Sequence, residues 1–576
     1  MSVTNRRAGA AAEGRRERAA AAATSLAREL PLVLLGIEVA ASIVLLLSYG
    51  SGLNFFQDEW DFLLHRRGLN LHAFLAPDNE HISVFAAAVF KFFESTFGMT
   101  STMPYRVVAT ILLAATAVLL FVFLRSLIGN WLALLGAIMV LFLGPAWQTL
   151  LLPVEMARVA SLAAGIGMLL ALRRRDRFGD RLACVLLTAS VLCFSLGVAF
   201  IAAAAVDVAL RRTSWRQRLF IPTVPLAIYL LWYATYGHEA TGNVSLHNLA
   251  TSPIYLVKAL ASALQALLGA WPTQTLQPDH PTWGWVLLGV TVAAVAIRLR
   301  QSRVVGAQLW PVAAAAAASW LLAAATYLPG REATSSRFQY TSVVFVLLVL
   351  AELFPGIRVT RFRLGAATAV AALALAANIS TLTRGRDFLR VQSGLSRADL
   401  GALELARRTV DPTFRLTPDI AGTQLLVVVD AGSYLSAVDA YGSPADGPSK
   451  LAAAPGVDRA WADVVLGYAL PVTLDELHGS HAGAAARVRC ETLPAGSDAL
   501  RGGGALRPGR TLIRVAPGDA ATVRLRRFAS GSFPFALGSI PGGTEAALAI
   551  PADRSPRPWH IRVEATQAVT LCERPA

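Results

Sequence analysis

The sequence predicts a polytopic α-helical membrane domain followed by an extracytoplasmic α/β module and a β-sandwich. Hydrophobic residues make up 55% of the 576 residues, only 15% are charged, and the mean hydropathy is +0.51. Soluble domains do not have this composition. Apolar runs long enough to cross a bilayer recur up to residue 382. After residue 383 they give way to short strand-like segments separated by Gly and Pro turns.

Basic residues lie in short clusters between the apolar runs and indicate the membrane topology. The chain has 52 Lys and Arg against 37 Asp and Glu, a formal charge of +15. Cytoplasmic loops of membrane proteins carry an excess of Lys and Arg, so this charge predicts helix orientation and no nucleic-acid partner. Residues 1–29 lack a small-residue cleavage site and are expected to form a cytoplasmic tail. The clusters predicted to be cytoplasmic are 6–18, 173–181, 211–218, 298–303 and 358–363.

The domain at residues 30–383 is predicted to cross the membrane about eleven times, because about 20 apolar residues span a hydrocarbon core. The segment 182–210 has basic residues at both ends, so it must leave the cytoplasmic side and return as a hairpin that breaks near 195–197. The N-terminus is then cytoplasmic and everything after 383 is outside. The other predicted spans are 31–49, 105–124, 131–150, 157–172, 219–236, 283–297, 309–328, 338–353 and 364–382.

Two further apolar segments are not predicted to span. Residues 82–97 carry Lys91 and Glu94 and fit an amphipathic helix on the outer surface, and 253–270 fits a second outer interfacial segment. Nearly all the isolated polar residues of the membrane half then fall on the outer face. We therefore expect a polar pocket that is open to the outside, formed by 50–104, 151–156, 237–282 and 329–337.

The candidate catalytic residues are carboxylates at the bilayer edge. Asp58 and Glu59 open the first outer loop, directly after the first span. A carboxylate within hydrogen-bond reach of a hydroxyl can take its proton as the oxygen attacks, and acidic side chains are costly to keep at a membrane. Asp58 is the preferred base, and Glu59 and Glu155 are the other candidates. A solvated loop start or a helix cap is the alternative role for these residues.

With its long outer loop opening on Asp58-Glu59, an interfacial helix, a cytoplasmic hairpin and an outer C-terminal domain, the chain resembles the GT-C superfamily of integral-membrane glycosyltransferases. The resemblance implies a hexosyl- or pentosyltransferase of cell wall biogenesis at the cell membrane. Its donor would be a polyprenyl-phosphate-linked sugar and its acceptor an extracytoplasmic glycan or protein. With one base and no evident nucleophile, a single displacement with inversion is expected. The triplet Asn79-Glu80-His81 is no general signature of the superfamily, so the sugar and the acceptor stay open.

The leaving group of such a reaction is a lipid phosphate whose negative charge grows in the transition state, so Arg donors should face it. Binding of outer Arg residues to lipid headgroups is the alternative. Carboxylates with water also suit Mg²⁺ or Mn²⁺, but no metal-ligand spacing is present, and metal dependence stays open. The candidate substrate-binding residues are Trp60, Glu80, His81, Arg158, Arg331 and Arg337.

The soluble part is expected to contain two modules. Residues 384–483 read as α/β, with a strand at 425–430 and helices at 400–408, 433–441 and 459–466. Residues 484–576 show short alternating strands typical of a β-sandwich, at 486–490, 511–515, 521–526, 545–550, 560–565 and 568–572. Sandwiches at the outer end of membrane glycosyltransferases resemble carbohydrate-binding modules, and a purely structural cap is the alternative.

The four cysteines divide into two pairs. Cys490 and Cys572 both lie in predicted strands of the outer domain, where an oxidising compartment would let them form a disulfide. Cys184 and Cys193 lie in a predicted membrane helix and are expected to be buried apolar residues.

Other functional classes fit the sequence less well. A secondary transporter or lipid flippase would show internal repeats and charged or broken helices at mid-membrane, and neither is evident. A non-catalytic scaffold would need no acidic pair in the first loop. A ligase that moves a whole polymer from polyprenyl diphosphate is the nearest alternative within glycosyl transfer.

Overall fold

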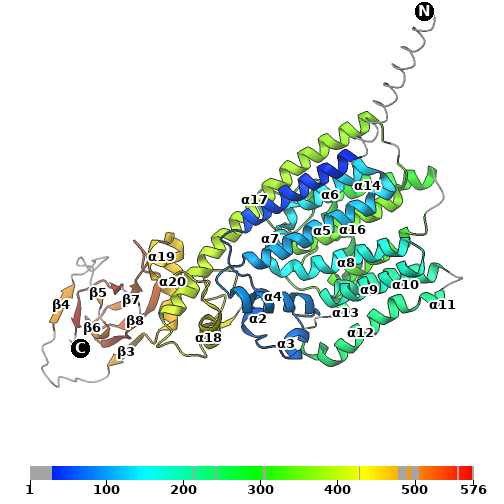
Figure 1. Cartoon of the computed structure of the whole chain (residues 1–576). Coiled ribbons are helices and arrows are strands. Elements are labelled where there is room, and N and C mark those ends of the chain that lie inside the picture. The colour runs from blue at the N-terminus through cyan, green and yellow to red at the C-terminus, as the bar shows by residue number, and fades with distance from the viewer. Residues whose placement is uncertain are drawn as a thin grey trace, which may run out of the picture. The chain divides into compact units, whose positions relative to one another are not determined.

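The computed structural model describes residues 29–211, 215–240, 242, 244–301, 306–357, 359–426, 428–477, 489–493, 505–506, 508–553, 555 and 557–573 (Figure 1). Residues 1–28 of the predicted tail at 1–29, and the predicted domain boundary at 483–484, lie outside these residues. The chain divides into two compact units. We call Met1–Ser51, Gly68–Phe90 and Met103–Asp387 the helical unit, and Gly52–Arg67, Lys91–Thr102 and Phe388–Ala576 the C-terminal unit.

Seven helices of the described chain are long and apolar enough to cross a membrane. Five of them are Glu29–Gly50, α5 (Met103–Ile128), α14 (Thr282–Gln301), α16 (Ser336–Leu353) and α17 (Arg361–Leu405). The sixth, Pro153–Arg173, consists of η2 (Pro153–Glu155) and α8 (Met156–Arg173). The seventh, Trp215–Glu239, contains α11 (Trp215–Arg218), α12 (Phe220–Tyr236) and η3 (Gly237–Glu239). An eighth is possible if α6 (Asn130–Leu141) and the segment holding η1 (Gly144–Ala146) and α7 (Trp147–Leu151), bent by 42°, form one span.

The number of candidate spans that meet these criteria in the described chain is therefore lower than the eleven expected. Among the predicted spans, α10 (Leu196–Leu210) and α15 (Leu309–Ala325) are apolar but have only 15 and 17 residues. A helix of 17 residues is about 26 Å long, which is shorter than a hydrocarbon core of about 30 Å. The first arm of the predicted hairpin, α9 (Arg177–Cys193), carries charged residues in its first turns. By length and composition, these three helices do not meet the criteria for a membrane span.

The hairpin itself forms where the sequence predicts it. Helix α9 ends at Cys193, Phe194 is extended, and α10 begins at Leu196. The two arms pack closely at the break, because a Cβ atom on Gly197 would lie 2.5 Å from the backbone of Val191. Only glycine fits this close approach.

Two arginines connect α8 to α16. At the start of α8, Arg158 donates a hydrogen bond from Nη1 to the carbonyl oxygen of Arg337, at a distance of 2.6 Å. At the other end, Arg173 forms an ion pair with Glu352 near the end of α16. The two helices therefore run in the same direction, and α5 lies beside both of them (Figure 1). The end that holds Arg158 is opposite the Arg-rich turn 173–181, which the sequence predicts to be cytoplasmic.

The two predicted interfacial segments form α4 (Val84–Phe97) and α13 (Leu246–Leu267), and neither is among the seven candidate spans. Helix α4 is amphipathic with its charges directed inward. Lys91 and Glu94 are buried, whereas Phe92 and Phe97 are 61% and 55% exposed. An outward aromatic side suits a helix that lies in a membrane surface.

The α/β part of the C-terminal unit has more helix and less strand than the sequence predicts. The predicted helix 400–408 is the end of α17, which runs without a break from Arg361 to Leu405. The predicted strand 425–430 is reduced to β2 (Val429–Asp430), which pairs antiparallel with β1 (Arg415–Leu416). The remaining helices are α18 (Ala431–Tyr441), α19 (Pro448–Ala453) and α20 (Gly456–Ala469).

The rest of the C-terminal unit forms two antiparallel sheets, as expected of a sandwich. One has the order β3-β9-β6-β11-β4 and the other β5-β10-β7-β8. All six predicted strands are present, and alternate residues of β7 are buried. The sandwich begins before residue 484, because β3 is one of its strands. The strands are β3 (Thr473–Leu477), β4 (Arg489–Leu493), β5 (Ala505–Leu506), β6 (Gly509–Val515), β7 (Ala520–Arg526), β8 (Phe535–Pro541), β9 (Glu545–Ile550), β10 (Trp559–Glu564) and β11 (Val569–Glu573).

Two polar or covalent links hold this region together. Cys490 of β4 lies opposite Cys572 of β11, and the two form a disulfide, which is the pairing expected from the sequence. The carboxylate of Asp463 on α20 accepts hydrogen bonds of 2.8–2.9 Å from the backbone N–H groups of Arg527, Phe528 and Ala529. Burial raises the pKa of Asp463 although these donors favour its charged form. The helices before residue 470 and the sandwich are thus directly connected.

Candidate functional site

A cluster of charged and titratable side chains forms in the helical unit from three separate parts of the sequence. One part is the turn between α3 (Leu71–Leu75) and α4, the second is the start of α8, and the third is the segment that leads into α16. We call it the outer polar cluster, after the side of the membrane that the sequence predicts for these segments. Its members are Glu80, His81, Glu155, Arg158, Arg331 and Arg337.

The first part is a tight turn. The backbones of Asp78 and His81 exchange two hydrogen bonds of 2.8 and 2.9 Å. Asn79, between them, has a φ of +53°, in the left-handed region that asparagine tolerates better than most residues. The indole nitrogen of Trp232 on α12 donates to the carbonyl oxygen of Leu75 just before the turn, at 2.7 Å. The turn thus places Glu80 and His81 next to each other on a fixed backbone.

The third part is fixed by a buried glutamine. The side-chain nitrogen of Gln339, which is fully buried on α16, donates to the carbonyl oxygens of Ala333 and Ser335 at 2.8 and 3.3 Å. Its side-chain oxygen accepts a 3.1 Å hydrogen bond from Ser262 on α13. The segment before α16 is therefore anchored, and Arg331 within it forms an ion pair with Glu80.

Arg158 connects the second part to the third. Its Nη1 atom lies 2.8 Å from Oε2 of Glu155 and also donates to the carbonyl oxygen of Arg337. The guanidinium lies 5.0 Å from the ring centre of Phe194 and 5.6 Å from that of Phe338. Glu155 makes no capping hydrogen bond to α8, so helix capping does not explain its position.

His81 is held in the neutral state. Burial, together with the positive charges of Arg158, Arg331 and Arg337, lowers the pKa of His81 well below its ordinary value. Its ring packs against Phe194 with the centroids 4.0 Å apart, and its Nε2 atom lies 3.7 Å from Glu80 Oε1. Its buried Nδ1 atom has no hydrogen-bond partner among the described residues.

The three arginines differ in what they contact. Arg331 is neutralised by Glu80 and Arg158 by Glu155. The guanidinium of Arg337, which is only partly exposed, has no carboxylate partner in the described part of the chain. With His81 neutral, the six residues leave one positive charge unmatched. A partly exposed guanidinium of this kind is suited to bind a phosphate or a carboxylate.

The acidic loop that the sequence singles out belongs to the C-terminal unit, in α2 (Asp58–Leu64). Glu59 is fully buried and accepts a 2.9 Å hydrogen bond from the backbone N–H of Phe56, which lies two residues before the helix begins. Trp60 is also fully buried, and its ring lies edge-on to Phe55 and Tyr434, with centroids 5.6 and 6.1 Å away.

Glu59 and Trp60 therefore point into the interior of the C-terminal unit, and the catalytic and substrate-binding roles expected for them stay predictions. The reason is helical spacing, since Trp60, Leu63 and Leu64 form one apolar face of α2 that packs inward. Asp61 pairs with Arg66 at 2.7 Å and with His65 at 3.2 Å. Asp58 differs, because it is partly exposed and no described residue forms a hydrogen bond or ion pair with its carboxylate.

The donor set for a metal ion is not present in the described chain. No three His, Cys, Asp or Glu side chains come together there as metal ligands. We therefore assign no residues to Mg²⁺ or Mn²⁺.

Sequence inspection missed the aromatic and amide groups that complete the cluster. Phe194 and Phe338 form its walls, and Gln339 anchors its third part. A signal was present for Phe194, which directly precedes the predicted hairpin break. Nothing in the sequence distinguishes Gln339 from an ordinary polar residue at a helix end.

No family model matches the chain, and no curated protein matches it. A solved structure that is similar to it is the crystal structure of ArnT from Cupriavidus metallidurans bound to undecaprenyl phosphate. The two chains are 13% identical, the match covers 72% of this chain and 89% of that chain, and the TM-score is 0.42. No residue role is taken from this similarity.

The neutral state of His81 predicts how stability depends on pH. The pKa of His81 is lowered in the folded protein, so between that pKa and about 6.5 the unfolded chain binds more protons, and stability falls as the pH falls below about 6.5. Above about pH 6.5 His81 is neutral in both the folded and the unfolded state, so its contribution to the free energy of unfolding does not change with pH. The variant His81→Asn should lose part of this dependence, measured as unfolding midpoints from pH 5 to 8. His247→Asn, outside the cluster, is the control. Identical pH curves for wild type and His81→Asn would contradict the assignment.

Proposed function

We propose that this protein is a membrane glycosyltransferase that moves a sugar from a polyprenyl-phosphate donor to an extracytoplasmic glycan or protein acceptor of the cell envelope. The observation that supports this most directly is the unmatched guanidinium of Arg337 beside the neutral His81. The cluster lies at the starts of α8 and α16, two candidate membrane spans. A donor with one phosphate on a long apolar tail needs a cation at this kind of position.

The charges of the outer polar cluster favour one phosphate over two. A sugar linked to polyprenyl phosphate carries a single negative charge on its phosphodiester, which the one unmatched guanidinium can balance. A polyprenyl diphosphate, the donor of a polymer ligase, carries a further charge, whereas Arg158 and Arg331 are already neutralised by carboxylates. This balance supports sugar transfer over polymer ligation.

In the proposed reaction, an acceptor hydroxyl attacks the anomeric carbon and gives its proton to a carboxylate. The bond from that carbon to the phosphate oxygen breaks, its electron pair stays on the oxygen, and the phosphate gains a second negative charge. Arg337 would stabilise that growing charge. His81, which is neutral and carries a proton on one ring nitrogen, can donate a further hydrogen bond without adding a fixed charge. One displacement of this kind inverts the anomeric centre.

We assign proton acceptance to Asp58, because the other candidate acids are occupied. Glu59 is buried and accepts a hydrogen bond from the backbone N–H of Phe56, Asp61 is paired with Arg66, and Glu155 is paired with Arg158. A cytoplasmic N-terminus and carbohydrate binding by the β-sandwich remain part of the proposal on sequence grounds alone.

Substitution of two cluster arginines separates binding from stability. Arg337→Gln should weaken binding of undecaprenyl phosphate by about 10- to 100-fold, typical of losing a charged hydrogen bond, with little change in the unfolding temperature. Arg331→Gln should instead lower the unfolding temperature, because Glu80, whose side chain is 11% exposed, would lose its counter-charge. Binding is measured on the purified full-length protein by titration with the lipid phosphate. Wild-type affinity in Arg337→Gln would contradict the role of Arg337.

The proposed role of Asp58 as the base is tested by measuring the rate of sugar transfer. Asp58→Asn should reduce sugar transfer by about two orders of magnitude or more while binding of undecaprenyl phosphate is unchanged, since only proton transfer is lost. The control Asp61→Asn should mainly lower the unfolding temperature, because it breaks the ion pair with Arg66. Near-normal turnover in Asp58→Asn would move the role to Glu59 or Glu155.

A further inference from the structure

We propose that a second site in the helical unit, at the opposite end of α8 from the outer polar cluster, binds the phosphate headgroups of anionic lipids. It consists of exposed arginines in the turn before α9, at the start of α9 and on α11, and we call it the basic face. Its arginines are Arg175, Arg177, Arg181 and Arg216. This proposal is independent of the proposed function.

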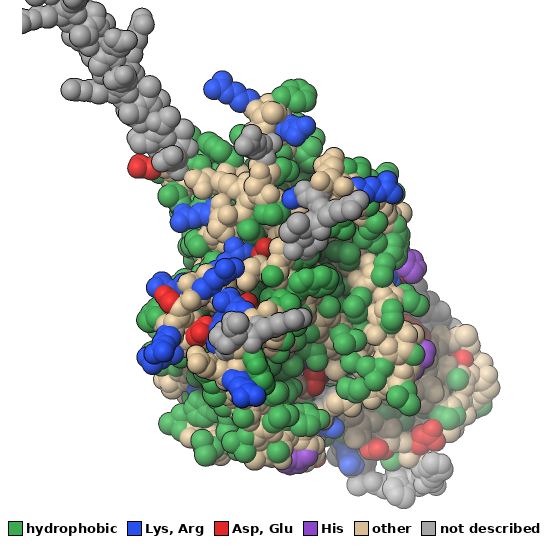
Figure 2. All heavy atoms as spheres, turned by 90° about the vertical axis from the view of Figure 1, so that its right-hand side faces the viewer, with side chains coloured by type: hydrophobic (Ala, Val, Ile, Leu, Met, Phe, Trp, Pro, Cys, Tyr) green, Lys and Arg blue, Asp and Glu red, His purple; other side chains and the backbone are tan. Residues whose placement is uncertain are grey.

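The arginines of the basic face are available to a ligand. All four are exposed, and no described residue offers them a carboxylate partner. Exposed aromatic rings lie among them, because Phe178 is 61% and Trp215 is 42% exposed. Arg174 lies over the Phe178 ring at 5.1 Å, and Arg216 lies over the Trp215 ring at 5.4 Å. Figure 2 shows Lys and Arg side chains gathered with hydrophobic side chains at this end of the molecule.

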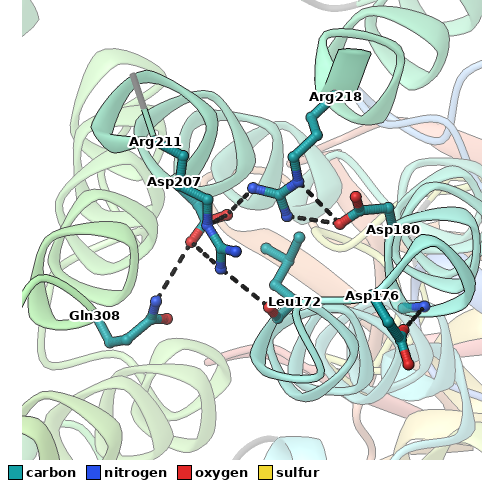
Figure 3. Close-up of polar contacts among 8 residues, drawn as sticks. Leu172, Asp176, Asp180, Asp207, Arg211, Arg218 and Gln308 are labelled. Carbon is teal, nitrogen blue, oxygen red and sulfur yellow. Dashed lines mark hydrogen bonds and ion pairs between the residues drawn. The ribbon is translucent and has the colours of Figure 1, made fainter. Parts of the chain in front are cut away.

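A buried ion-pair network holds the two parts of the basic face in place (Figure 3). Arg218 of α11 is 5% exposed and donates to Asp180 of α9 at 2.7 Å and to Asp207 of α10 at 2.9 Å. Asp207 also pairs with Arg211, whose guanidinium donates to the carbonyl oxygen of Leu172 at 3.1 Å. These contacts connect the ends of α8 and α10, the first turn of α9 and the short helix α11. Arg177, Arg181 and Arg216 therefore lie on helices that the network holds together, and Arg175 lies in the turn between α8 and α9.

The position of the basic face favours a lipid over another anionic ligand. The candidate span that ends in α8 stops at Arg173, and another begins at Trp215. The arginines therefore lie where helices leave the hydrocarbon region. Trp is enriched at this depth of a membrane, and an exposed Phe can insert into it. Guanidinium groups bind phosphate oxygens in a bidentate manner. A soluble nucleic acid or an acidic protein would gain nothing from exposed Phe178 and Trp215 at a bilayer edge.

The test compares two sets of four arginines. The test variant is Arg175→Gln/Arg177→Gln/Arg181→Gln/Arg216→Gln. The control is Arg298→Gln/Arg300→Gln/Arg361→Gln/Arg363→Gln, which removes the same charge from the end of α14 and the start of α17. Purified full-length protein in detergent is titrated with dioleoyl phosphatidylglycerol and, separately, with dioleoyl phosphatidylcholine. Bound lipid is counted by native mass spectrometry, and the unfolding midpoint is recorded.

Wild type and control should retain phosphatidylglycerol over phosphatidylcholine and gain a higher unfolding midpoint with it. The test variant should lose at least tenfold in apparent affinity for phosphatidylglycerol, and added salt should weaken binding in wild type. Equal losses in both variants would mean a diffuse attraction without a site and would overturn the proposal. So would unchanged binding in the test variant, or equal retention of both lipids by wild type. The double variant Arg177→Gln/Arg181→Gln, expected to show a partial loss, provides the same comparison if the fourfold variant does not fold.

Discussion

The arrangement of the helical unit depends on the two polar ties between α8 and α16. Lipid-facing helices gain no hydrophobic driving force from contact with each other, so packing and polar contacts must set their register. Arg158 binds the backbone at the start of α16, and Arg173 binds Glu352 near its end. A shift of one helix along the other would break both contacts. The same register of α8 and α16 places Glu155 and Arg158 near Arg337. The outer polar cluster therefore follows directly from this register.

The composition of the outer polar cluster follows from the cost of partly buried charge. A guanidinium or carboxylate removed from water is stable only with a partner, and Glu80 with Arg331 and Glu155 with Arg158 satisfy this for four of the six residues. His81 avoids the cost by staying neutral, since its pKa is lowered. Arg337 is the exception. A charge kept without a partner at an otherwise balanced site is the feature that most needs a functional explanation, and an anionic substrate supplies one.

Much of the fold was predictable because its signals are local. Basic residues at both ends of 182–210 predicted the α9–α10 hairpin, and alternating residues predicted six of the strands. Strands β3, β5 and β8 were missed. The first is largely polar, the second has only two residues, and the third contains Gly538 and ends at Pro541. The outer polar cluster was predictable from the predicted membrane topology, which places Glu80, Glu155 and Arg331 on the same side of the membrane. The burial of Trp60 was not predictable, since its ring packs against Tyr434, which is far away in the sequence.

The most direct test of the central claim is a structure of the full-length protein in lipid nanodiscs with undecaprenyl phosphate bound, determined by electron cryo-microscopy. The account predicts density for the phosphate at hydrogen-bonding distance, about 2.7–3.2 Å, from the guanidinium of Arg337. The Glu80–Arg331 and Glu155–Arg158 pairs should be retained. Phosphate density elsewhere on the protein, with no ligand at Arg337, would contradict it.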